Sequence, residues 1–199
     1  NVRYLVAFGG SAGWIVVSDD DLVLVTDSRY IEQASAQMPC GRAALATGGL
    51  ADYTVSYIAQ HGLERVAFEA DNLTVSNLST LESSLQARDS SCVLMPTTGL
   101  VEGLREVKDA YELEAMRRAA ALADGAVRHG RRVISAGMTE SELAWRLERW
   151  LREHGSGAMP FDIIVASGPN ASLPHAVPSG RAFRGGEPVV IDLGASVDG

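Results

Sequence analysis

The pattern of the sequence changes near residue 100, and this change limits the folds that the chain can adopt. Before it, short apolar and β-branched runs alternate with stretches of helical spacing, which indicates an α/β layer. The clearest strand-like runs are Leu22–Thr26, Arg65–Phe68 and Cys92–Met95, and the helical stretches are Tyr30–Gln37, Tyr53–Gln60 and Val75–Ala87. The segment Pro96–Gly99 then interrupts the pattern, and we place a domain boundary beyond it, between residues 104 and 105.

The start of the chain predicts two successive hairpins. Tyr4–Phe8 and Trp14–Val17 have the composition of short strands on either side of Gly9–Gly13, and a third strand follows the polar turn at Asp19–Asp21. A glycine-rich phosphate-binding loop lies between a strand and the N-terminus of a helix, whereas here another strand follows the glycines. We therefore interpret Gly9–Gly13 as a hairpin turn in an antiparallel arrangement.

Two helices with matching start signals follow the boundary. Asp109 and Glu112 have the spacing of a capping box, and Thr139 and Glu142 repeat it. Apolar stripes predict the buried faces, which are Leu113, Met116, Ala120, Ala123 and Val127 in the first helix and Leu143, Leu147, Trp150 and Leu151 in the second. We expect Trp145 in the core as well. Strands are predicted at Phe161–Val165 and Val189–Leu193, which makes residues 105–199 an α+β region.

Charge supports the same division and excludes some partners. Residues 1–104 hold 12 acidic and 5 basic side chains, whereas residues 105–199 hold 13 and 12. The formal net charge of −8 argues against a nucleic-acid partner. No apolar run approaches the roughly 20 residues that span a bilayer, so no membrane partner is expected. Cys40 and Cys92 lack metal-binding spacing, and two isolated thiols are typical of a reducing compartment.

His175 is the candidate catalytic residue. It lies between Pro174 and Ala176-Val177-Pro178, and the two prolines stiffen the backbone of a loop between strands. Such loops often hold catalytic groups, although a plain loop position is an equal alternative from the residues alone. The other histidines, at positions 61, 129 and 154, lie in or at the ends of polar helices, and we expect them to face solvent.

Asp192 is the candidate metal ligand. It ends the apolar run Val189–Ile191, where a buried carboxylate must be paired, hydrogen-bonded or bound to metal, because burying it alone is costly. The alternative is a capping role in a turn before Leu193-Gly194. Asp198 has the same strand parity but precedes Gly199, and we interpret it as a turn residue.

Taken together, these segments resemble the Xaa-Pro aminopeptidase and prolidase family, the proline-directed branch of the pita-bread metallopeptidases. The stretches that carry the resemblance are Asn1–Leu5 with Thr26–Tyr30, Arg105–Leu113, Phe161–His175 and Pro188–Gly199. The resemblance covers nearly the whole chain. It implies an α/β then α+β chain, with a creatinase-like N-terminal α/β domain at 1–104 and the first part of a pita-bread catalytic domain at 105–199.

The resemblance also implies roles for the two candidates. Asp192 matches the first metal-ligand aspartate of the family, and His175 matches the histidine that contacts the substrate and helps to move protons. The other ligands, a second aspartate, a histidine and two glutamates, would follow Gly199, so the chain is similar to an internal fragment and is expected to be inactive alone. The intact parent would be a cytoplasmic homodimer that uses two divalent metal ions, manganese or cobalt, to cleave proline-containing peptides.

Two other functions are open to this scaffold. One is a creatinase-like amidinohydrolase, which needs no metal, and the other is a peptide-binding pseudoenzyme that has lost its ligands. Fold alone does not separate the three. Asp192 favours the peptidase, because a metal-free relative has no need of an acid at that position.

Overall fold

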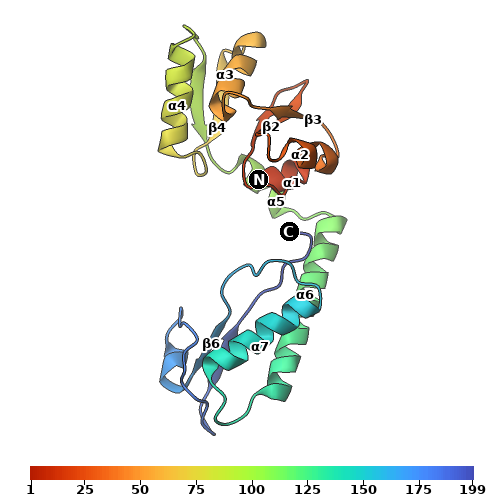
Figure 1. The fold of residues 1–199 in the computed structure, drawn as a ribbon, viewed down its shortest axis with the longest axis vertical. Coiled ribbons are helices and arrows are strands. Elements are labelled where there is room, and N and C mark those ends of the chain that lie inside the picture. Colours follow the sequence, from red (N-terminus) through yellow and green to blue (C-terminus); the bar gives the residue numbers. More distant parts are fainter. The chain divides into compact units, whose positions relative to one another are not determined.

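The computed structural model describes all residues, 1–199, as two compact units (Figure 1). The first unit is Asn1–Val107 and the second is Lys108–Gly199. Each unit has its own buried apolar core. The division falls after Val107, whereas the sequence placed it after residue 104. The domain limits of 1–104 and 105–199 stay a prediction, which limited proteolysis can test.

The first unit begins with a three-stranded sheet in the order β1-β2-β3. Strand β1 (Trp14–Val17) pairs antiparallel with β2 (Leu22–Thr26), and β2 pairs in parallel with β3 (Arg42–Leu45). Helix α2 (Ile31–Gln37) connects the two parallel strands. The central strand is the most buried, with Val23, Leu24 and Val25 fully inaccessible to solvent. This burial explains why β2 is a nearly continuous apolar run in the sequence.

A second, two-stranded sheet completes the unit. Strands β4 (Arg65–Glu69) and β5 (Val93–Thr97) are parallel and are connected through helix α4 (Val75–Gln86). Helix α3 (Leu50–Gln60) packs against α4 through a core that includes Val55, Ile58, Leu81 and Leu85. Helix α5 (Leu100–Glu106) ends the unit. The mixture of strands and covering helices confirms the predicted α/β class for this part of the chain.

The first predicted strand is wrong. Residues Val2–Val6 form helix α1, which ends at Ala7 in the left-handed conformation. Val6 and Phe8 are buried against Leu24 and Ala34, so the helix presents one apolar side to the core. The sequence did not separate the two forms, because a run this short fits a strand or a helical turn equally well. Gly9–Gly13 therefore connects a helix to a strand, and only the β1–β2 hairpin exists.

Two elements were missed. Strand β3 has the sequence Arg-Ala-Ala-Leu, and alanine has a low strand propensity. It forms because it pairs with the buried β2, and Ala44 is buried there. Helix α5 spans only seven residues, none of them buried, and includes Gly103, which has a low helix propensity.

The second unit pairs two helices with a short hairpin. Helix α6 (Ala110–Val133) and helix α7 (Glu140–Glu153) both begin with the predicted capping boxes, formed by Asp109 with Glu112 and by Thr139 with Glu142. Strands β6 (Ile164–Ser167) and β7 (Val189–Asp192) are antiparallel, and the 3₁₀ helix η1 (Gly168–Ser172) follows β6 (Figure 1). Strand β6 thus begins three positions later than predicted from Phe161.

Helix α7 supplies the core of this unit as expected. Leu143, Leu147 and Leu151 are fully buried and pack with Val165 of β6. Trp150 is partly buried against the same core, whereas the prediction for Trp145 is wrong, since 61% of it is exposed. None of the helices in the chain is both long and apolar enough to cross a bilayer.

The buried face of α6 differs from the prediction. Its buried residues are Gly125, Ala126 and Gly130, whereas Leu113 and Met116 of the predicted stripe are 40% and 54% exposed. A Cβ atom at Gly125 would lie 2.3 Å from the ring of Trp150, so the absence of a side chain lets α7 approach closely. The predicted stripe missed this face because it followed apolar spacing, and the glycines that permit the close contact give no hydrophobic signal.

Candidate functional site

His175 lies on the exposed part of the loop between η1 and β7. The neighbouring Ala176 is buried, and its amide donates to the carbonyl of Leu173, which closes a turn with Pro174 and His175 at its centre. The imidazole is exposed and has no hydrogen-bond or ion-pair partner in the chain. It is therefore free to meet a ligand.

Asp192 is the last residue of β7 and is exposed, which corrects the expectation of a buried carboxylate. In the β6–β7 ladder Val165 pairs with Ile191 in the core of the unit, and Asp192 pairs with the half-buried Ile164. Val190, on the same side of β7 as Asp192, is 45% exposed, although its partner Ala166 is buried. Asp192 thus avoids the cost of burial without any partner, and its carboxylate is free.

The two candidates do not form a metal site by themselves. No hydrogen bond or ion pair joins His175 to Asp192, and no group of three or more histidine, cysteine, aspartate or glutamate side chains could hold an ion in this chain. Asp198 forms an ion pair with Arg118 and is not available as a ligand. The donor set therefore offers one acidic oxygen ligand and does not by itself fit a pair of metal ions.

The other histidines divide into two groups. His61 and His154 are exposed as predicted, and each stacks on an aromatic ring one helical turn earlier, Tyr57 and Trp150 respectively. His129 is instead half-buried beside Trp150, and burial together with nearby arginines lowers its pKa. These contacts identify all three as helix-packing residues.

Glu140 is the residue that the sequence analysis missed. It is the first residue of α7 and its side chain is fully buried. Its Oε1 accepts hydrogen bonds from the backbone amide and hydroxyl of Ser167, at 2.7 and 2.8 Å. Its Oε2 accepts from the hydroxyl and amide of Ser179, at 2.6 and 3.1 Å. The Asn170 amide group reaches both oxygens, at 3.2 and 3.1 Å.

These donors keep the buried carboxylate charged. Burial alone would raise the pKa of Glu140, but the hydrogen bonds from Ser179, Ser167 and Asn170 outweigh it and lower the pKa to about 2. Charge-assisted hydrogen bonds of this kind are stronger than neutral ones. Glu140 is therefore an anion at every physiological pH, fixed by the groups that surround it.

The hydrogen-bond network around Glu140 extends to an ion pair between Arg181 and Glu187. Arg181 donates from Nη1 to the hydroxyl of Ser167 at 2.6 Å and from Nη2 to Glu187 at 2.6 Å. The Ser167 hydroxyl therefore accepts from Arg181 and donates to Glu140. Every polar side-chain atom that is buried in the chain has a hydrogen-bond partner. This completeness distinguishes the network from the unpartnered His175 and Asp192.

The sequence contained a signal for Glu140, although a weak one. An acidic residue is expected at the start of a helix on dipole grounds alone, so Glu140 does not stand out in the sequence. The informative signal is the set of short donors on both sides of His175, at Ser167, Asn170 and Ser179. Such donors require an acceptor when they are buried. The acceptor, Glu140, lies on a different element from the donors, so the residue pattern of its own helix does not reveal it.

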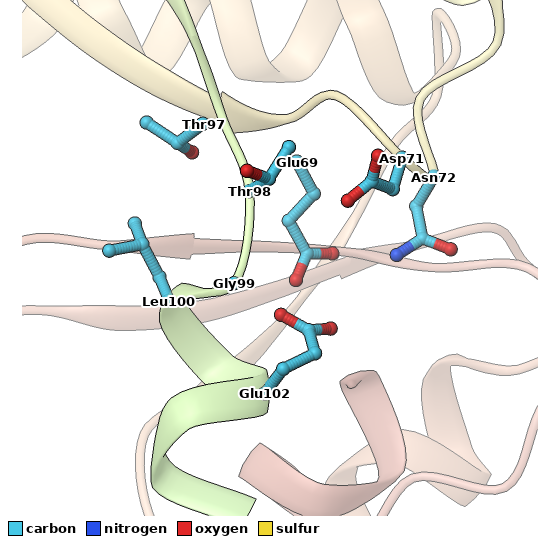
Figure 2. A pocket seen from close by; sticks show the side chains of 8 residues that line it. All are labelled: Glu69, Asp71, Asn72, Thr97, Thr98, Gly99, Leu100 and Glu102. Carbon is cyan, nitrogen blue, oxygen red and sulfur yellow. The ribbon is translucent and has the colours of Figure 1, made fainter.

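The first unit has one small acidic pocket at the carboxyl ends of its parallel strands β4 and β5. Figure 2 shows Glu69 at the end of β4 and Glu102 of α5 with their carboxylates directed toward each other, and Asp71 nearby. The side-chain amide of Asn1 donates to both glutamates, and Arg105 donates to Asn1. Glu69 and Glu102 are therefore hydrogen-bonded from within the chain, and we assign no function to this pocket.

Two sequence families match the chain, one for each part. The Creatinase/Prolidase N-terminal domain matches residues 1–107, and metallopeptidase family M24 matches residues 114–199. A curated relative from Bacillus subtilis (strain 168), named "Uncharacterized peptidase YqhT", is 36% identical over 199 residues. That alignment covers all of this chain and 55% of the relative, so the chain spans about half the length of the curated relative.

Solved structures agree with the fold. An Xaa-Pro dipeptidase from Bacillus anthracis has a TM-score of 0.90 and 35% identity, covering 98% of this chain and 53% of that one. An X-Pro aminopeptidase from Thermotoga maritima has a TM-score of 0.89 and 30% identity, covering 99% and 55%. A prolidase from Pyrococcus furiosus has a TM-score of 0.82 and 27% identity, covering 98% and 55%. The predicted succession of a creatinase-like domain and the start of a pita-bread domain is confirmed.

Proposed function

The chain belongs to metallopeptidase family M24 and carries the Creatinase/Prolidase N-terminal domain, and from this we propose that its protein is an exopeptidase that hydrolyses the bond before proline. The observation that carries the proposal is the similarity to an Xaa-Pro dipeptidase along almost the whole chain, at 35% identity. The relatives described above are peptidases by name, and no observation favours an amidinohydrolase or a peptide-binding pseudoenzyme.

In this proposal Asp192 is a metal ligand. Support comes from its chemistry and its place, since an aspartate is a hard oxygen donor and this one is exposed without a partner. One carboxylate does not complete a dinuclear site, so the other ligands would come from sequence outside this chain. We propose manganese or cobalt as the metals, which would supply an activated water when bound. By the same argument, the 199-residue chain is expected to be inactive alone.

His175 takes the role toward the substrate. It is exposed and unpartnered in the turn between Leu173 and Ala176, so it can donate or accept a proton at a bound peptide. We assign proline-containing peptides as the substrate class, since the named relatives include an Xaa-Pro dipeptidase and an X-Pro aminopeptidase.

Location and assembly complete the proposal. Cys40 and Cys92 are both free thiols, which supports a cytoplasmic protein, because oxidising compartments favour disulfides. We propose that the intact protein is a homodimer, as the resemblance to the family implies.

The test is hydrolysis of matched peptides by the full-length protein that contains this chain. The protein is stripped of metal, reloaded with manganese or cobalt, and assayed on an Ala-Pro dipeptide and an Ala-Pro-Ala tripeptide, with Ala-Ala and Ala-Ala-Ala as controls. Metal-dependent cleavage confined to the proline peptides supports the proposal. Equal cleavage of the control peptides, or hydrolysis of creatine with no dependence on metal, contradicts it.

A further inference from the structure

We propose that Glu140 is a positioning residue that fixes the loop bearing His175 for the peptidase reaction. This inference rests on the proposed function and deepens it, since the resemblance assigns no role to Glu140. No hydrogen bond joins Glu140 to His175 itself, since the carboxylate is bonded to Ser167, Asn170 and Ser179. It acts through the backbone and side chains at the base of the loop.

The two carboxylate oxygens of Glu140 hold opposite ends of one loop. Ser167, at the end of β6, donates twice to Oε1, and Ser179, after the loop, donates twice to Oε2. Asn170 in η1 donates to both oxygens. A single side chain therefore ties the start of the loop to its return, and His175 lies between the two ties.

The return strand of the loop is also held by the start of α7. The Glu140 amide donates to the carbonyl of Arg181, and the Ser141 amide donates to the carbonyl of Ser179. The Ser141 hydroxyl donates to the carbonyl of Pro178 at 3.0 Å. Since Leu143 and Leu147 of the same helix are fully buried, the loop is anchored to a rigid element. Rigid support of this kind is what keeps a catalytic group in place.

The tip of the loop has little other support. Leu173 is 57% exposed and Val177 is 82% exposed, while Ala176 is the buried residue nearest to His175. The hydrogen bonds within the tip are local, from Leu173 to Asn170 and from Ala176 to Leu173. The position of His175 is therefore set by the base, where Glu140 lies.

A carboxylate is required because every group that faces it donates. Glutamine has nearly the same shape, but its NH₂ would face either the Ser167 amide or the Ser179 amide, and neither amide can accept a hydrogen bond. Glu140→Gln would thus lose hydrogen bonds at one end of the loop and keep those at the other, while the contacts of Ser141 with Ser179 and Pro178 would remain. The substitution therefore tests the hydrogen bonds between Glu140 and the loop with almost no change in side-chain volume.

Thr139 offers a matched control at the same helix end. Its hydroxyl accepts from the Glu142 amide at 3.2 Å as the N-cap of α7. Thr139→Ala weakens the start of α7 but leaves the carboxylate of Glu140 and its donors in place. A general loss of structure at this end would affect both variants, whereas a loss of loop position would affect Glu140→Gln alone.

The experiment compares the full-length manganese-loaded wild type with Glu140→Gln, Thr139→Ala, His175→Ala and the double variant of Glu140 and His175. Steady-state kinetics on Ala-Pro, metal content, and hydrogen–deuterium exchange of peptides from 168–178 are measured for each. We expect Glu140→Gln to keep its metal, to lower kcat on the order of 10- to 100-fold with a smaller change in KM, and to speed exchange in 168–178. Thr139→Ala should change kcat by no more than about twofold and leave that exchange unaltered.

The double variant separates positioning from plain stability. If Glu140 acts through His175, the loss on removing His175 should be much smaller in the Glu140→Gln background than in the wild type. Should Glu140→Gln fail to fold, Ser179→Ala removes one donor from the same tie and should show the same changes at smaller size.

The outcomes also separate this inference from the proposed function. An active wild type whose Glu140→Gln variant keeps its kcat, or keeps normal exchange in 168–178, overturns the role of Glu140 alone. Independent, additive losses for Glu140 and His175 overturn it as well. A metal-loaded wild type that does not cleave Ala-Pro overturns the proposed function and removes the catalytic consequence of Glu140 with it.

Discussion

The second unit holds two polar regions that differ in almost every physical respect. Around Glu140 the charge is buried, every oxygen is hydrogen-bonded, and the donors come from both ends of one loop. Around Asp192 the charge is exposed, the neighbouring Val190 is 45% exposed, and the carboxylate has no partner. The comparison indicates that a fully hydrogen-bonded carboxylate such as Glu140 stabilises the fold. An exposed carboxylate without a partner, such as Asp192, is free to bind a ligand.

Asp192→Ala gives the largest expected effect on function. In the full-length protein it should abolish both metal binding and activity, because a methyl group cannot replace an oxygen ligand. Its thermal stability in the metal-free state should change little, since the side chain is exposed and unpaired. Metal stoichiometry measured beside kinetics tests this. A variant that keeps both metal ions and most of its activity would remove Asp192 from the site.

His175→Ala should lower kcat on the order of 10²-fold or more, as loss of a proton-transfer group does. The metal content should stay close to that of the wild type, because in the proposed function His175 contacts the substrate and not the metal. The same metal and kinetic measurements test it. Loss of metal on this substitution would mean that His175 is a ligand and that the two roles are wrongly divided.

Glu140→Ala should lower the free energy of unfolding far more than Asp192→Ala does. It removes the acceptor for buried donors at Ser167 and Ser179, and unpaired buried groups cost about 3 kcal/mol of unfolding free energy. Asp192→Ala should cost less than about 0.5 kcal/mol by the same measurement. Chemical denaturation of both variants, without metal, gives the comparison. Equal losses would show that the two carboxylates do not differ as we describe.

Acidic pH should separate the two carboxylates in the same way. The pKa of Glu140 is about 2 in the folded protein, below its ordinary value of 4.5, so the unfolded chain binds the proton more tightly. Its contribution to stability is complete above about pH 4.5 and is lost as the pH falls toward 2, at most about 3 kcal/mol. Unfolding midpoints at pH 6, 4 and 3 should fall more steeply for the wild type than for Glu140→Gln. Parallel curves would contradict this assignment.

Thr139→Ala gives the smallest expected effect. Loss of an N-cap hydrogen bond costs about 1 kcal/mol of unfolding free energy, and the bond from the Glu142 amide to the Thr139 hydroxyl is the one removed. The equivalent change at the start of α6, Asp109→Ala, is the matched control, because it removes a capping box away from the Glu140 network. Similar small losses in the two variants would show that the cap itself adds nothing special at Glu140.

The sequence predicted helices α6 and α7 well, because residues close together in the chain determine where a helix begins and which of its faces is apolar. Both capping boxes are present, and the buried leucines of α7 lie on the predicted face. The predictions failed where packing decides, as in helix α1, the alanine-rich β3 and the small-residue face of α6. In each of these places a neighbouring element, and not the local pattern, selects the conformation.

The sequence by itself determined the two-part pattern, the helix starts and the candidates His175 and Asp192, because these depend on residue types at short spacing. Only the tertiary structure decided that Asp192 is exposed and that Glu140 joins Ser167 to Ser179. The physical reason is that hydrogen bonds and burial depend on distance in space. Ser167 and Ser179 are far from Glu140 along the chain, and they meet it only when β6 and the returning loop pack against the first turn of α7.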